Sequence, residues 1–256
     1  MNRLIVWREE CDGLGRVALT DRRAEHIRAV LKCGVGDTLR AGFANECAAT
    51  ATVVSVEEGR CVVEVRENSG ETLPPPMIDV MLALPRPRFL ARILPQLPPL
   101  GVRRIFLCDA DRVEKSFFGS QLLKRDNYLP VLVEGVEQGG GVVVPEVRVV
   151  RNLRQLIQDI ATDYDHDCKL VAHPATLGTP GANPATLPRA GLVPGVPRVV
   201  AIGCEGGWTE REVAWMEEAG FRRFSLGERT LRTDTACIAV LAVVGFLCYS
   251  GTNACQ

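Results

Sequence analysis

The sequence predicts a two-domain α/β protein, with a small β-barrel-like domain at residues 1–73 and a parallel α/β domain at residues 74–256. Short β-prone runs separated by turns fill most of the first third. Three consecutive prolines at residues 74–76 cannot continue a strand or a helix, so they indicate a linker. After them the chain alternates short buried strands with helical segments, which is typical of a parallel α/β sheet.

In the first domain one helix is expected at residues 21–31, between β-prone runs. Its Ala24, Ile27, Val30 and Leu31 fall on one face, and two glycines soon afterwards end it. We expect the strands of this domain at residues 4–7, 38–41, 49–56 and 60–65, with a hairpin connection at 57–59.

In the second domain, ligands are expected beyond the carboxyl ends of the parallel strands. The almost wholly apolar segment 235–249 is shorter than the roughly 20 residues that a bilayer requires. We therefore expect no membrane span, and a helix buried in the core or at a subunit interface. The predicted strands are residues 78–84, 104–108, 169–172, 198–202 and 224–226, and the predicted helices include 153–161 and 210–219.

Charge is distributed unevenly along the chain. Thirty basic and 31 acidic residues give a net charge of −1, so no global field attracts the chain to nucleic acid. Residues 86–125, however, carry nine basic and three acidic side chains, a net charge of +6. This segment is either a polyanion contact or a solvated face that nearby acidic groups balance.

The ten cysteines are scattered and include no CxxC pair, and the N-terminal residues do not resemble a signal peptide. We therefore expect reduced thiols and a cytoplasmic protein. Because the sequence has no His/Cys cluster at zinc-ligand spacing, no metal is expected.

Two glycine-rich strand ends carry the candidate chemistry. The first is IGCEGGWT at residues 202–209, where Thr209 and Glu212 form a capping box that starts a helix. The second is LGERTLRTDT at residues 226–235, in which arginines open a helix against its dipole and so indicate a function. Neither contains a dinucleotide-binding or P-loop motif. Together with the strand end at His173, they predict three loops around one pocket.

These two motifs closely resemble the signatures IGPEGG(F/W)(S/T) and LGxRxLRxET of the ribosomal RNA small subunit methyltransferase E family. Weaker similarities support the resemblance: His26 to Leu31 with Gly36-Asp37, Leu100-Gly101-Val102, Arg112 with Lys115, Glu137-Gln138, and His173-Pro174. The chain departs from the family pattern at Gln96, Pro99, Cys204 and Gly139 to Gly141. Prolines near Gln96 are expected to shorten or break the helix that precedes Gly101.

The resemblance implies a SPOUT-class α/β domain with a deep trefoil knot at residues 74–256 and a PUA-like RNA-binding β-barrel domain at residues 1–73. It also implies a homodimer that associates through the knot region, and methylation of N3 of a uridine in 16S rRNA of the small ribosomal subunit. S-adenosyl-L-methionine is the implied cofactor. The implied cofactor-binding residues are Ala172, His173, Ile202, Gly203, Glu205, Gly206, Gly207, Leu226, Gly227, Leu231 and Arg232.

Arg232 and Glu205 are the expected catalytic residues. Uridine N3 is a weakly acidic imide, so a guanidinium would stabilise the developing anion and a carboxylate would accept the proton or orient the base. The alternative is a structural ion pair, between Arg232 and Asp234 or involving Glu205. The expected RNA-binding residues are Arg28, Arg86, Arg88, Arg112 and Lys115.

Two other functions remain open at the level of the sequence. One is a knotted RNA- or ribosome-binding module that keeps the cofactor pocket but has lost efficient catalysis. The other is a SPOUT methyltransferase that acts on another RNA.

Overall fold

The computed structural model describes residues 1–165, 168–174, 196 and 198–249. The chain divides into two compact units, Met1–Pro75 with Pro130–Val144, and Pro76–Leu129 with Pro145–Gln256. The division between Pro75 and Pro76 lies within the proline run, two residues after the predicted boundary at 73/74. The sequence did not indicate that residues 130–144, which include most of helix α3 (Arg125–Gly139), belong to the first unit.

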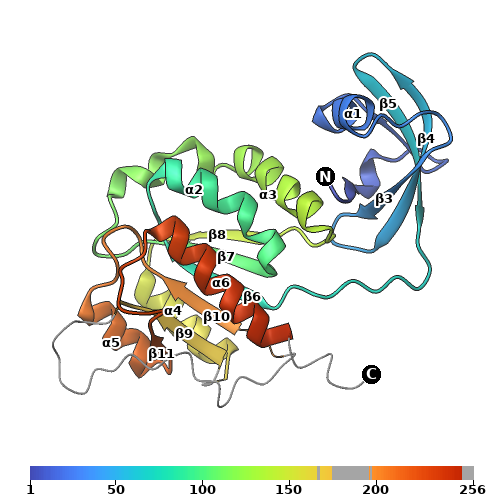
Figure 1. The fold of residues 1–256 in the computed structure, drawn as a ribbon. Coiled ribbons are helices and arrows are strands. Elements are labelled where there is room, and N and C mark those ends of the chain that lie inside the picture. Colours follow the sequence, from blue (N-terminus) through green and yellow to red (C-terminus); the bar gives the residue numbers. More distant parts are fainter. Residues whose placement is uncertain (166–167, 175–195, 197, 250–256) are drawn as a thin grey trace. The chain divides into compact units, whose positions relative to one another are not determined.

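The first unit contains a five-stranded sheet in the order β1-β3-β4-β5-β2 (Figure 1). Antiparallel β4 and β5 are joined by the predicted hairpin, with Glu57 opposite Arg60. Strand β2 was not predicted, and closure of the sheet into a barrel stays a prediction. The strands are β1 (Leu4–Val6), β2 (Arg16–Leu19), β3 (Thr38–Phe43), β4 (Ala48–Glu57) and β5 (Arg60–Glu67).

The helix of this unit combines α1 (Arg22–Glu25) with a π-helical turn (His26–Val30). Ala24 and Ile27 are buried as predicted, but Val30 and Leu31 are exposed. The prediction was wrong for these two residues because the wider π turn, in which Leu31 N–H donates to His26 O, rotates them away from the core.

Segment 130–144 packs against the N-terminal strand of the first unit. The backbone carbonyl of Glu137 accepts hydrogen bonds from the backbone N–H groups of Asn2 and Arg3, at 2.8 and 3.1 Å. The buried Glu137 side chain pairs with Arg22 at 2.7 Å. Glu137 therefore connects α3 to the residues that precede β1 and to α1.

The second unit is built on a six-stranded, wholly parallel sheet in the order β11-β9-β10-β6-β7-β8. Four strands match their predicted positions closely. β11 lies two residues earlier than predicted, and the edge strand β8 was missed because most of its side chains are exposed. The strands are β6 (Ile78–Ala83), β7 (Val102–Cys108), β8 (Glu146–Val150), β9 (Lys169–Ala172), β10 (Arg198–Ile202) and β11 (Arg222–Phe224).

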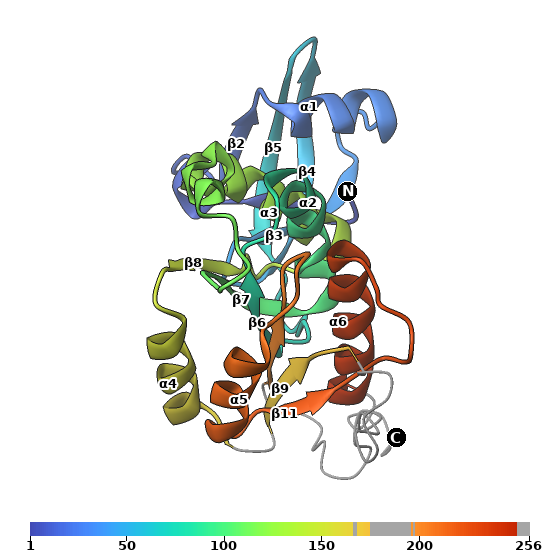
Figure 2. The same ribbon diagram turned by 90° about the vertical axis from the view of Figure 1, so that its left-hand side faces the viewer.

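Helices cover both faces of this sheet (Figure 2). α4 (Leu153–Asp163) and α5 (Glu210–Glu218) lie on one face, and α6 (Thr233–Tyr249) lies on the other, where it packs against β10 and α2 (Pro87–Ile93). The expected break before Gly101 is confirmed. α2 ends at Ile93, and two 3-10 turns follow, Leu94–Gln96 and Pro98–Leu100.

Helix α6 has one buried and one exposed apolar face. Cys237, Leu241 and Val244 are buried, whereas Ile238 and Phe246 are exposed by 42% and 70%. Within the described residues, no helix is both long and apolar enough to span a membrane. The nine cysteines in this part of the chain are all free.

Candidate functional site

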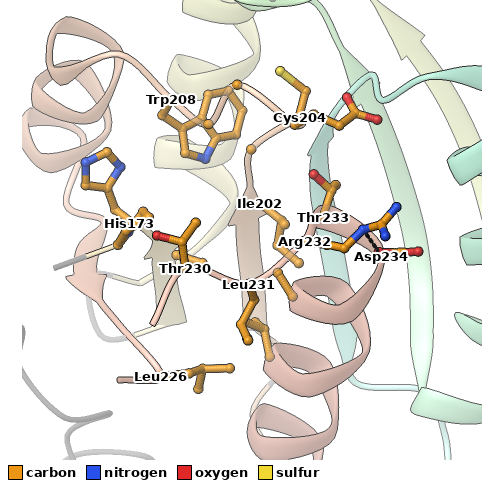
Figure 3. A pocket seen from close by; sticks show the side chains of 18 of the residues that line it. His173, Ile202, Cys204, Trp208, Leu226, Thr230, Leu231, Arg232, Thr233 and Asp234 are labelled. Carbon is orange, nitrogen blue, oxygen red and sulfur yellow. Dashed lines mark ion pairs between the residues drawn. The ribbon is translucent and has the colours of Figure 1, made fainter. Parts of the chain in front are cut away.

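The carboxyl ends of β9, β10 and β11, together with the start of α6, surround a cavity of about 530 Å³ (Figure 3). Trp208 and His173 lie on one side of it, Arg232 and Asp234 lie on the other, and Ile202 lies between them. Most of the predicted site residues line this cavity: Ala172, His173, Ile202, Gly203, Glu205, Gly206, Gly207, Leu226, Leu231 and Arg232, with Arg86 and Arg88 from the start of α2.

The loop after β10 requires glycine at two positions. A Cβ at Gly203 would lie 2.9 Å from the Cα of Gly207, and Gly207 itself has a φ of +70°. The turn is closed by a hydrogen bond from Gly207 N–H to the carbonyl of Cys204 at 2.8 Å. The loop therefore folds back tightly on itself, and its three glycines leave part of its backbone uncovered by side chains.

The start of α5 holds this loop in place. The predicted capping box is confirmed: Thr209 N–H donates to Glu212 at 2.7 Å, and the Thr209 side chain accepts from Glu212 N–H. The second oxygen of the buried Glu212 accepts from Asp111 N–H at 2.7 Å, so the loop after β7 is tied to the same helix end. The guanidinium of Arg112 donates to Gly206 O at 2.6 Å.

One side of the cavity presents polar atoms without partners. His173 Nε2 lies 3.0 Å from Glu210, while His173 Nδ1 and the indole N–H of the buried Trp208 have no hydrogen-bond partner within the described part of the chain. Burial works to raise the pKa of Glu210, but hydrogen bonds from Arg223 and His173 outweigh it and lower that pKa. Glu210 therefore stays ionised and orients the His173 ring.

The other side carries the cationic group that the sequence singled out. The Arg232 side chain is 70% exposed and lies over the Phe89 ring, 5.3 Å from its centroid. Its Nε is 3.9 Å from Asp234, whose other oxygen lies 3.3 Å from Arg92. The expected alternative, an ion pair to Asp234, is present, but it is long and exposed, and such pairs hold a guanidinium only weakly.

Glu205 has a defined partner in the second unit. Its carboxylate accepts a hydrogen bond of 3.0 Å from the backbone N–H of Arg86, which precedes the first residue of α2. The exposed side chain thus joins the β10 loop to α2 and lines the cavity. The neighbouring Cys204 is buried, and burial raises the pKa of its thiol, so it remains neutral at physiological pH.

Four predicted residues lie outside the cavity lining. Gly227 lies in the turn after β11, where its carbonyl accepts from Ser225 at 2.7 Å. Arg112 supports the loop after β10, and Lys115 pairs with Asp109. Arg28 is exposed in the first unit and pairs with Glu25.

Sequence analysis missed two aromatic residues of the site. Phe89 is buried, and the guanidiniums of Arg88, Arg92 and Arg232 all lie within 5.4 Å of its ring centroid. Trp208 stands within the first glycine-rich motif, and its buried ring lines the cavity. The spacing of Arg88, Phe89 and Arg92 on one short helix was the available signal for the first of these residues.

Comparison with known proteins identifies the family. A model of the RNA methyltransferase domain matches residues 72–245. Ribosomal RNA small subunit methyltransferase E of Treponema pallidum is 30% identical over 248 residues, which cover 95% of this chain and 90% of that protein. The chain belongs to the ribosomal RNA small subunit methyltransferase E family. The enzyme is therefore a methyltransferase.

Two further proteins are similar to the chain, one in sequence and one in fold. The Bacillus subtilis protein of that name is 28% identical to the enzyme over 236 residues, which cover 90% of this chain and 89% of that protein. A crystal structure of the Neisseria gonorrhoeae protein, bound to S-adenosyl methionine, has a similar fold, with a TM-score of 0.72 at 24% identity and coverage of 96% and 98% of the two chains.

Proposed function

We propose that the enzyme transfers the methyl group of S-adenosylmethionine to N3 of a uridine in 16S rRNA of the small ribosomal subunit. The observation that carries this proposal is the convergence of two glycine-rich strand ends on one cavity, with an exposed guanidinium at its rim. Membership of the family, and the names of its members, support the substrate.

The cavity fits S-adenosylmethionine. Its volume of about 530 Å³ lies in the range of small-molecule sites, and the tight loop after β10 presents backbone groups that suit an adenosine or amino-acid moiety. The unpartnered His173 Nδ1 and Trp208 N–H add polar atoms on the same side. Backbone groups of Ala172, Ile202, Gly203, Gly206, Leu226 and Leu231, which all line the cavity, would hold the cofactor with them.

The cofactor supplies an electrophilic methyl group with its own leaving group. The chain must then bind the uracil ring and favour loss of the N3 proton. Arg232 is suited to stabilise the imide anion, because its ion pair to Asp234 is long, at 3.9 Å, and Arg232 lines the cavity. Glu205, on the loop after β10, is suited to accept the proton or to orient the base.

The RNA-binding role of Arg86 and Arg88 fits their positions. Both side chains are exposed at the cavity rim, and neither guanidinium has a carboxylate partner among the residues described. Together with Arg229 in the turn after β11, they provide positive charge where a flipped nucleotide and its phosphates would enter. Arg28 would serve the same purpose in the first unit.

The finer features of the family belong to the same proposal. The strand order β11-β9-β10-β6, in which β10 pairs with both β9 and the much earlier β6 while β11 pairs with β9, supports a SPOUT fold with a trefoil knot. The exposed apolar face of α6 supports a homodimer that associates beside the knot region. The five-stranded first unit supports a PUA-like RNA-binding domain, and an rRNA substrate is consistent with a cytoplasmic enzyme.

Three measurements test the proposal. Calorimetry should detect binding of S-adenosylmethionine, and labelled methyl should then pass to 30S particles from a strain that lacks the modification. Mass spectrometry of the digested rRNA should locate the label on N3 of a uridine. Tight cofactor binding without transfer would instead favour a ribosome-binding module, and transfer only to another RNA would favour a different SPOUT methyltransferase.

A further inference from the structure

We propose that substrate RNA beyond the target nucleotide follows the carboxyl edge of the parallel sheet, from the cavity across Arg112 to Arg151 and Arg154. This inference rests on the proposed function, because it takes the substrate to be RNA. It adds a surface on the loops after β7 and β8 and on helices α4 and α5, which carry none of the residues predicted for catalysis or cofactor binding.

The two edges of the sheet differ in how their arginines are neutralised. At the amino edge, Arg103 and Arg104 both pair with the buried Asp79, at 2.8 and 2.7 Å. At the carboxyl edge, several arginines have no carboxylate partner within the described residues. These are Arg86 and Arg88 after β6, Arg112 after β7, Arg151 and Arg154 after β8, and Arg229 after β11.

A series of side-chain contacts joins this surface to the cavity. Arg112 donates to the carbonyl of Gly206, which lines the cavity. The adjacent Asp111 accepts from Arg211 at 2.8 and 2.9 Å. The guanidinium of Arg211 lies over the ring of Trp215, 5.1 Å from its centroid.

Arg154 completes this path, because it also lies against the Trp215 ring. Its guanidinium lies 5.3 Å from the Trp215 centroid, and α4 and α5 are in contact. The path from Gly206 to Arg154 is therefore continuous, and every member of it belongs to the second unit.

Aromatic rings hold these guanidiniums at defined positions. Arg151 lies over Phe118, 4.0 Å from the ring centroid, and Arg154 and Arg211 share Trp215. Arg154 and Arg211 also stand in the first turns of α4 and α5, where a cation opposes the helix dipole. Ordered guanidinium planes bind phosphates and stack on unpaired bases, which is how single-stranded RNA is recognised.

Acidic side chains also lie on these elements, and Glu114, Asp159 and Glu218 are exposed. Asp109 pairs with Lys115, and Asp111 pairs with Arg211, so these four side chains are balanced. The hydrogen bonds from Arg211 lower the pKa of Asp111 below its usual value. Within the described residues, no carboxylate forms an ion pair with Arg112, Arg151 or Arg154, so these three guanidiniums are available to the phosphates of a polyanion.

The double variant Arg151→Gln/Arg154→Gln tests this path. Filter binding of 16S rRNA transcribed in vitro, at several KCl concentrations, should show affinity about tenfold weaker and a salt slope smaller by about 1.4, or about 0.7 for each lost phosphate contact in single-stranded RNA. In methyl transfer to 30S particles, KM should rise with little change in kcat. Calorimetry should give an unchanged affinity for S-adenosylmethionine.

The matched control is Arg148→Gln, which removes an exposed arginine that pairs with Glu146 on β8. It should leave the RNA affinity and the salt slope at wild-type values. Arg151→Lys/Arg154→Lys should keep most of the salt slope, because it retains the charge. If wild type methylates 30S particles and the double Gln variant binds RNA like wild type, the proposed path is wrong while the proposed function stands. If wild type neither binds nor methylates RNA, the proposed function itself fails.

Discussion

At the residue scale, the site combines a weakly restrained cation, Arg232, with a tightly folded backbone loop after β10. Arg232 stands immediately before α6, with its side chain 70% exposed beside the Phe89 ring. The loop after β10, by contrast, is fixed by the close approach of Gly203 to Gly207 and by the capping box of α5. This division suits a reaction in which the cofactor is bound before the nucleotide, and only the group that meets the nucleotide needs freedom to adjust.

The variant Arg232→Ala should therefore lower kcat for methyl transfer by roughly 100- to 1,000-fold, as removal of one anion-stabilising donor does in other enzymes. Its affinity for S-adenosylmethionine should stay within a few-fold of wild type, because backbone groups carry that binding. Single-turnover transfer to 30S particles and calorimetry measure the two effects. The variant Arg232→Lys keeps the charge but loses the planar guanidinium, so its kcat should lie between those of wild type and Arg232→Ala. An unchanged kcat in Arg232→Ala would remove this residue from catalysis.

Several residues of the site could be predicted from the sequence because their motifs carry local geometry. Gly203, Gly207 and the Thr209 to Glu212 capping box are properties of a few consecutive residues. The contact between Phe89 and Arg232, and the link between Glu205 and the N–H of Arg86, could not be predicted. They depend on how α2 meets the β10 loop and the residue before α6, from which more than a hundred residues of sequence separate it.

At the element scale, the amino edge of the sheet contains a buried charge network. Asp79, at the start of β6, accepts hydrogen bonds from Arg103 and Arg104 of β7 and from the hydroxyl of Tyr164 after α4. Burial works to raise the pKa of Asp79, but these three groups outweigh it and lower the pKa. Burial, followed by the hydrogen bond that its hydroxyl donates to Asp79, raises the pKa of Tyr164 to about 12.

We expect Asp79→Asn to lower the unfolding free energy by about 2 kcal/mol at pH 7, because a buried ionised acceptor is lost. A carboxylate whose folded pKa is lowered stabilises the protein above its unfolded pKa of about 4, and this contribution is lost as pH falls through the folded value. The difference between variant and wild type should therefore shrink below about pH 4. Urea unfolding at several pH values measures it. The exposed control Glu146→Gln should change stability little, and a pH-independent difference for Asp79→Asn would contradict this account.

The helices and strands were predicted best where the sequence carries a clear local signal. The buried strands β6, β9 and β10 were predicted closely because continuous apolar runs mark them, and the break of α2 follows from its prolines. The edge strand β8 and helix α3 were missed. β8 is largely exposed, and α3 contains Pro130. Both are stabilised by tertiary packing rather than by local pattern.

At the scale of the whole molecule, helix α6 links the cavity to a second, unpartnered surface. Ala236 and Val240 on one side of this helix line the cavity. Ile238 and Phe246 lie on its exposed side, where they form an apolar strip with Val243. Exposed apolar strips of this kind mark protein interfaces, which agrees with the proposed homodimer. A partner bound there would also restrain the helix that shapes the cofactor cavity.

The variant Phe246→Asp tests this coupling, because a buried and unpaired charge at a dimer interface costs several kcal/mol. Sedimentation velocity should show a dimer for wild type and a monomer for the variant, and calorimetry should show weaker binding of S-adenosylmethionine. Leu14→Asp is the matched control, since Leu14 of the first unit is also 70% exposed, and it should leave both properties unchanged. A wild-type monomer would refute the homodimer. A monomeric Phe246→Asp with wild-type cofactor affinity would keep the dimer but show that the cavity forms without it.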